Sequence, residues 1–181
     1  MAGTGRRHDA DPLQFSLNVP VPGRVAAIAS ELRPALSAFE SIRDRHTLVL
    51  KRLDEGDRDG LETRVRQALA GAPACAARVA GIGTFEDPPA GSAPVVYLAV
   101  ESPGLVQIHE RLCDRFAPAM GIEGENYLPH VTLARGGGDA ATAAVERLLE
   151  TEVEPVTWTV GELVFWDARY DEATGRVSLP A

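Results

Sequence analysis

The stretch that decides the fold is Asn126-Tyr127-Leu128-Pro129-His130-Val131-Thr132-Leu133-Ala134-Arg135. It is rich in residues that favour β-strands, and Pro129, which lacks a backbone donor, fits the first position of a strand. Side chains alternate along a strand, so His130, Thr132 and Ala134 share one face and Val131, Leu133 and Arg135 the other. The sequence therefore predicts a strand that presents an imidazole and a hydroxyl on one face and ends at the glycine run 136–138.

A similar unit precedes this stretch. A single shift aligns Leu17 with Leu98, Val19 with Val100, Pro22-Gly23 with Pro103-Gly104, and Val25 with Val106. Each copy reads as a strand, a Pro-Gly turn and an amphipathic helix, followed by a strand with a histidine near its start. The earlier of these histidines is His46. The pattern indicates an internal duplication.

The order of the predicted elements favours an α+β fold with antiparallel sheets. Apolar spacings of three and four predict helices over 25–39, 61–69, 105–116 and 141–149, the first made irregular by Pro34. Alternating or continuous β-rich runs predict strands over 15–19, 45–53, 75–85, 95–100, 130–135, 156–160, 162–166 and 176–179. Several strands follow one another directly, which is not typical of a doubly wound parallel sheet. We expect a flexible tail over 1–13 and a single bilobed domain over 14–181.

Composition limits the function classes. The chain has 181 residues, 45% of them hydrophobic, which is enough for a sizeable core. Its net charge of -8 argues against a surface that coats nucleic acid, so a nucleic-acid substrate would be met locally. Cys75 and Cys113 are expected to be free thiols, and no apolar run is long enough to span a membrane. We expect a cytoplasmic protein that is a monomer, with no obligate protein partner.

The paired histidines suggest acid–base chemistry. If the two halves pack about a pseudo-twofold axis, His46 and His130 would face one another across a cleft. Such a pair supplies a general base on one side of a phosphorus centre and a general acid on the other, with no metal and no cofactor. The Thr132 hydroxyl would donate to a phosphate oxygen as charge builds up.

The segment Tyr127 to Arg135 resembles the second signature of the two-histidine (2H) phosphoesterase superfamily. It resembles in particular the branch of 2'-5' RNA ligase-like proteins and RNA 2',3'-cyclic phosphodiesterases, where a histidine, any residue, and a threonine or serine follow one another. The likeness covers roughly residues 14 to 180. It implies a bilobed, duplicated α+β fold with two antiparallel sheets lining a central cleft and helices packed outside. It also implies metal-independent hydrolysis, or reversible formation, of a 2'-5' or 2',3'-cyclic phosphodiester.

The first half matches this signature less well. His46 is followed by Thr47 and then Leu48, so the hydroxyl is one position early. Either a bulge brings Thr47 to the cleft, or the first half supplies no hydroxyl and backbone amides and a cation hold the phosphate. The candidate cations form a local basic cluster: Arg43, Arg45, Lys51 and Arg52. The alternative is that His46 merely caps a strand and the cluster is a solvated edge.

Arg135 matches the trailing arginine of the second signature. Strand alternation places it on the face opposite His130, so a salt bridge or a sheet-edge role competes with a substrate contact.

The sequence thus predicts a phosphoesterase acting on an RNA end or a nucleotide. His46 and His130 are the predicted catalytic pair, and the predicted phosphate-binding residues are Thr132, Thr47, Arg135, Lys51 and Arg45. The first alternative is a binding module of the same fold that has lost catalysis, suggested by Leu48. A metal-dependent hydrolase is a further alternative, although carboxylates at ligand spacing are missing.

Overall fold

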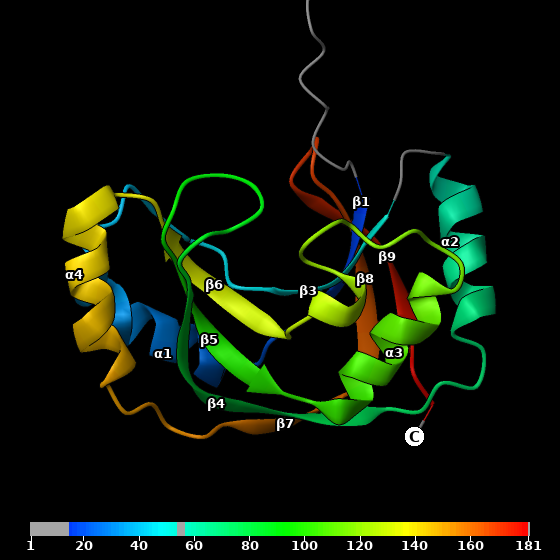
Figure 1. Ribbon diagram of the computed structural model, residues 1–181. Helices are drawn as coiled ribbons and strands as arrows, with labels where there is room; N and C mark the ends of the chain where they lie inside the picture. Colours follow the sequence, from blue (N-terminus) through cyan, green and yellow to red (C-terminus); the bar gives the residue numbers. More distant parts are fainter. Residues whose placement is uncertain (1–14, 54–56, 181) are drawn as a thin grey trace, which may run out of the picture.

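Two antiparallel sheets form the frame of the protein (Figure 1). The computed structural model describes residues 15–53 and 57–180, so the tail predicted over 1–13 lies outside the described residues. The first sheet has the order β3-β1-β8-β9 and consists of β1 (Phe15–Val19), β3 (Leu48–Leu53), β8 (Glu162–Asp167) and β9 (Glu172–Ser178). The second has the order β2-β6-β5-β4-β7 and consists of β2 (Ser41–Ile42), β4 (Cys75–Phe85), β5 (Val95–Glu101), β6 (His130–Arg135) and β7 (Thr157–Val160). The predicted α+β class with two antiparallel sheets is confirmed.

The α-helices pack on the outside of the two sheets (Figure 1). α1 (Gly23–Leu32) and α4 (Gly138–Leu149) lie beside the second sheet, and α2 (Arg58–Ala68) lies beside the first. α3 (Pro103–Cys113) packs against β3 of the first sheet and β4 of the second. Short 3-10 helices follow α1 at Arg33–Leu36 and precede β6 at Gly124–Asn126. The helix predicted over 25–39 ends early because Pro34 has no backbone N–H to continue it.

The duplication seen in the sequence has a counterpart in the topology. β1, α1 and β3 repeat as β5, α3 and β6, and in each sheet the first strand of the unit is hydrogen-bonded to the last. α1 of the first unit lies beside the second sheet (Figure 1), and α3 of the second unit contacts β3 of the first unit. The two units are therefore interlocked. His130 begins β6 of the second sheet, and His46 lies in the segment that leads from β2 into β3 of the first sheet.

Strand alternation explains how the same strands build both core and cleft. On β1, Phe15, Leu17 and Val19 are buried in one hydrophobic cluster that includes residues of both sheets. Ser16 and Asn18, on the other face of β1, line the cleft described below. None of the described helices is long and apolar enough to cross a membrane.

Candidate active site

A cleft of about 270 Å³ lies between the two sheets. Its walls come from β1, β3 and β8 of the first sheet, from β6 of the second, and from the loops after β2 and β8. The lining residues are Ser16, Asn18, Arg43, Arg45, Thr47, Val49, Arg52, His130, Thr132, Trp166 and Asp171. Three arginines against one carboxylate give this surface a positive charge in a chain whose net charge is -8.

His130 begins β6 and lines the cleft. Its Nδ1 lies 2.7 Å from the Leu128 carbonyl oxygen, which can only accept, so the neutral ring carries its proton on Nδ1. Nε2 is then the acceptor of the ring. Burial beside the rings of Phe85 and Tyr97, 5.2 and 5.1 Å away between centroids, lowers the pKa of His130, and the charge of Arg52 lowers it further. The arrangement favours an uncharged imidazole that can accept a proton.

Thr132 and Thr47 both line the cleft, one from each half of the duplication. When the two segments are aligned on these threonines, His130-Val131-Thr132-Leu133 corresponds to Arg45-His46-Thr47-Leu48. The cleft follows the same correspondence, because Arg45 and Thr47 line it as His130 and Thr132 do. No bulge is needed to bring Thr47 to the cleft. Arg45, not His46, occupies the position equivalent to His130.

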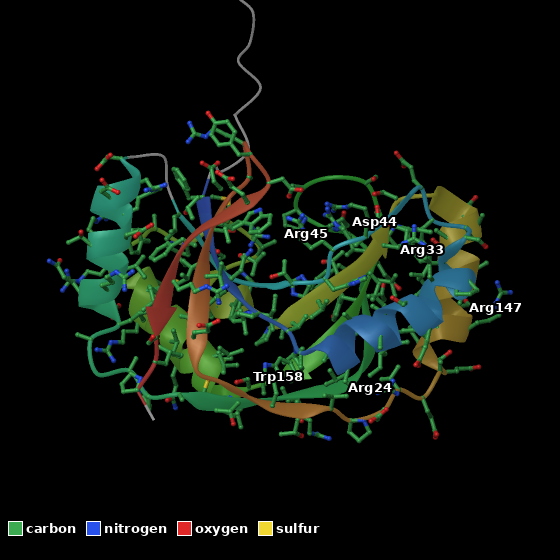
Figure 2. The ribbon with its side chains drawn as sticks, turned by 180° about the vertical axis from the view of Figure 1, so that it is seen from behind. Arg24, Arg33, Asp44, Arg45, Arg147 and Trp158 are labelled. Atoms are coloured by element: carbon green, nitrogen blue, oxygen red, sulfur yellow. The ribbon has the colours of Figure 1, made fainter. Side chains whose placement is uncertain are left out.

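His46 is not among the residues that line the cleft. It lies in the segment between β2 and β3, half-buried, and strand-like alternation from Thr47 places it on the opposite side. Its pKa is lowered by burial and by the nearby charge of Arg33, with Asp44 acting in the opposite direction. In Figure 2, Asp44 and Arg33 lie beyond Arg45, toward α1 and α4. The predicted convergence of the two imidazoles on one cleft is thus corrected: only His130 reaches it.

Arg45 reaches from the β2–β3 segment to the hairpin between β8 and β9. Its Nη1 donates to the Asp171 carboxylate at 3.1 Å and to the Asp171 carbonyl at 3.2 Å. Its guanidinium also lies 4.6 Å from the centroid of the Trp166 ring. Figure 2 shows Arg45 on the side of Asp44 that faces this hairpin. These contacts hold the positive charge of Arg45 at the cleft. The Arg45 side chain is half exposed, so an incoming anion has access to it.

A β-bulge decides which basic residue of β3 faces the cleft. Leu17 pairs with Lys51 but Asn18 pairs with Val49, so Leu50 is the extra residue. The bulge changes the alternation: Lys51 is fully buried and Arg52 lines the cleft. Lys51, predicted to bind phosphate, instead donates to Glu123 at 2.6 Å in the interior. Glu123 also accepts from the backbone N–H of Arg52 at 2.7 Å.

Arg135 has a structural role. Its Nη2 donates to the Ala90 carbonyl at 2.7 Å and its Nε to the Ser92 carbonyl at 3.3 Å. Gly91, between them, has φ +78°, and a Cβ there would come within 2.7 Å of the guanidinium. Arg135 therefore fastens the loop between β4 and β5 and does not line the cleft, which corrects the predicted substrate contact.

Sequence reasoning missed Ser16, Asn18 and Asp171. The signal for the first two was the polar face of a strand whose other face is apolar. Asp171 lies in a turn with φ +51° and is brought to the cleft only by tertiary structure. Within 15–53 and 57–180, no group of three or more His, Cys, Asp and Glu side chains is arranged to hold a metal ion.

The two interlocked sheets and the cleft between them define the class of the protein as 2H phosphoesterase-like. The model of the 2'-5' RNA ligase superfamily matches residues 46–172, and the chain belongs to that superfamily. No relative was found among curated proteins.

Solved structures agree with this assignment. Escherichia coli LigT complexed with NADP+ superposes with a TM-score of 0.65 and 18% identity, over 95% of this chain and all of LigT. A structure described as a phosphoesterase superposes with a TM-score of 0.64 and 19% identity, over 94% of this chain and all of the other chain. Kluyveromyces marxianus Usb1 superposes with a TM-score of 0.50 and 13% identity, over 93% of this chain and 97% of Usb1. LigT has also been solved with 3'-AMP, with ATP and with phosphate. At these identities the likeness shows the fold.

Proposed function

We propose that this protein is a metal-independent phosphoesterase that acts on nucleotides or RNA ends and uses His130, alone among the described residues of the cleft, to transfer a proton. The observation that carries this proposal is the state of His130: Nδ1 is committed to Leu128, and Nε2 remains as a base in a ring that lines the cleft. A base of this kind removes a proton from an attacking water or ribose hydroxyl.

The rest of the cleft suits a phosphate group. The hydroxyls of Thr47 and Thr132 donate to non-bridging oxygens from the two sides, and Arg43, Arg45 and Arg52 offset the negative charge that builds up in the transition state. LigT has been solved with nucleotides and with phosphate, which supports a phosphorylated ligand for this protein as well.

Turnover tests the proposal. Adenosine 2',3'-cyclic phosphate and thymidine 5'-(4-nitrophenyl phosphate) are incubated with the protein in excess EDTA, and products are separated by chromatography. We expect product from at least one of them, in proportion to the protein concentration and with EDTA without effect. Activity that EDTA abolishes and added metal restores would contradict the metal-independent mechanism.

A second candidate is a binding module that holds a nucleotide or RNA end without cleaving it. The observation that favours it is Arg45, which stands where the family signature has a histidine. Saturable binding of both compounds, with no product after long incubation at high protein concentration, would establish this candidate in place of the enzyme.

A further inference from the structure

Within the part of the chain that the structure describes, His130 is the one cleft side chain of a type whose ordinary pKa lies near neutral pH. Among its described lining residues, Ser16, Asn18 and the two threonines carry neutral hydroxyl or amide groups. The three arginines keep their protons under all conditions relevant to proteins. Asp171 forms an ion pair with Arg45 at 3.1 Å, and Lys51 lies in the interior, paired with Glu123. Among the described residues that line the cleft, none other than His130 can therefore act as a general acid.

The lack of a general acid has a consequence for the leaving group. When a P–O bond breaks, the electron pair goes to the leaving oxygen. A ribose alkoxide is a strong base, far more basic than a phosphate anion, so such a group needs a proton as it departs. A phosphate leaving group has a second pKa of about 6 and departs as an anion. Arg45 can stabilise that anion with its charge but cannot protonate it.

We infer that the preferred substrates are nucleotides joined through a phosphoanhydride, whose leaving group is itself a phosphate. This inference rests on the proposed function and specifies its substrate class. Water attacks the phosphorus, and His130 Nε2 takes the proton of that water. The bond to the bridging oxygen breaks, the phosphate departs as an anion beside Arg45, and His130 releases its proton to solvent. Nothing is oxidised or reduced, and water is the only co-reactant.

A series of substrates with different leaving groups measures how strongly the rate depends on the leaving group. The substrates are thymidine 5'-aryl phosphodiesters from the 4-nitrophenyl to the unsubstituted phenyl ester, which lack a 2'-hydroxyl and cannot cleave themselves. We expect kcat/KM of the unaltered protein to fall at least about 100-fold across the series, because general-acid help of 10²- to 10⁴-fold is missing. P1,P2-diadenosine diphosphate should be cleaved faster than adenylyl-(3',5')-adenosine.

Arg45→His provides the matched variant, since it restores an imidazole at the position equivalent to His130, on a side chain that is half exposed and absent from the core. In this variant, kcat/KM should vary by less than about 10-fold across the series. The pH profile should also show kcat/KM falling at alkaline pH, where the new imidazole loses its proton.

The outcomes separate this inference from the proposed function. Hydrolysis with a flat series and a bell-shaped pH profile in the unaltered protein would overturn the inference and leave the phosphoesterase in place. If none of the esters and neither dinucleotide is hydrolysed, both are overturned.

Discussion

The Nζ atom of Lys51 lies 2.6 Å from Oε1 of Glu123, and both side chains are buried. Lys51 also donates to the carbonyls of Arg52 and Ala117, and Glu123 accepts from the backbone of Ala119 and Arg52. Burial alone would raise the pKa of Glu123, but these donors hold it below its ordinary value. The pair fixes the end of β3 to the segment before β6, and with it the position of Arg52 at the cleft.

Removing one member of this pair is expected to destabilise the fold strongly. Lys51→Met leaves the Glu123 carboxylate buried without its counter-ion and should lower the free energy of unfolding by about 3–5 kcal/mol. Urea unfolding followed by circular dichroism measures it. The double variant Lys51→Met with Glu123→Leu should recover most of the loss. A double variant as unstable as the sum of the two single variants would contradict a coupled pair.

Arg43 and Arg135 give a contrast between binding and structure. Arg43 is exposed and lines the cleft, so Arg43→Ala should weaken 3'-AMP binding by about 1.5–3 kcal/mol, measured by calorimetry. Arg135→Ala removes two hydrogen bonds to the β4–β5 loop and should lower stability by about 1–3 kcal/mol with unchanged affinity. Equal losses of affinity in both variants would show that Arg135 acts at the cleft after all.

The pH dependence of kcat/KM should show a single limb. Burial lowers the pKa of His130 below 6.5, and Arg52 adds to this, while the bond to Leu128 opposes it. The base form is therefore present at neutral pH and is lost as pH falls through this lowered pKa. We expect the rate to rise with pH up to a midpoint below 6.5 and then to stay level. A midpoint above 6.5 would contradict a neutral His130.

Buried His109 should make stability fall in acid. Its Nδ1 donates to Leu50 O at 2.7 Å, its Nε2 accepts from Gly124 N–H at 2.9 Å, and the ring stacks on Tyr127. Burial lowers its pKa, so below about 6.5 the unfolded chain takes up a proton that the folded protein does not. Stability should decrease from that pH downward, and His109→Gln should reduce the slope in urea unfolding. An unchanged slope in the variant would exclude His109 as a source.

The sequence predicted those parts of the site that lie on regular strands. β6 alternates without interruption from His130 to Thr132, so both were placed on one face correctly. The prediction of the site residues in the first half of the duplication was wrong for physical reasons. His46 was matched to His130 by residue type, although the Thr-Leu pair aligns Arg45 with it. The bulge at Leu50 turns Lys51 into the interior and brings Arg52 to the cleft. The pairing of β3 with its neighbouring strand determines this bulge, so the residues of β3 alone do not reveal the bulge.

His130 and His46 together provide the most direct test of the central claim. The measurement is kcat for thymidine 5'-(4-nitrophenyl phosphate) in EDTA, at saturating substrate, for the unaltered protein, His130→Ala and His46→Ala. The account predicts a loss of about 10²- to 10⁴-fold for His130→Ala and a change of less than about 3-fold for His46→Ala. Losses of equal size in the two variants would contradict a cleft in which His130 alone transfers the proton.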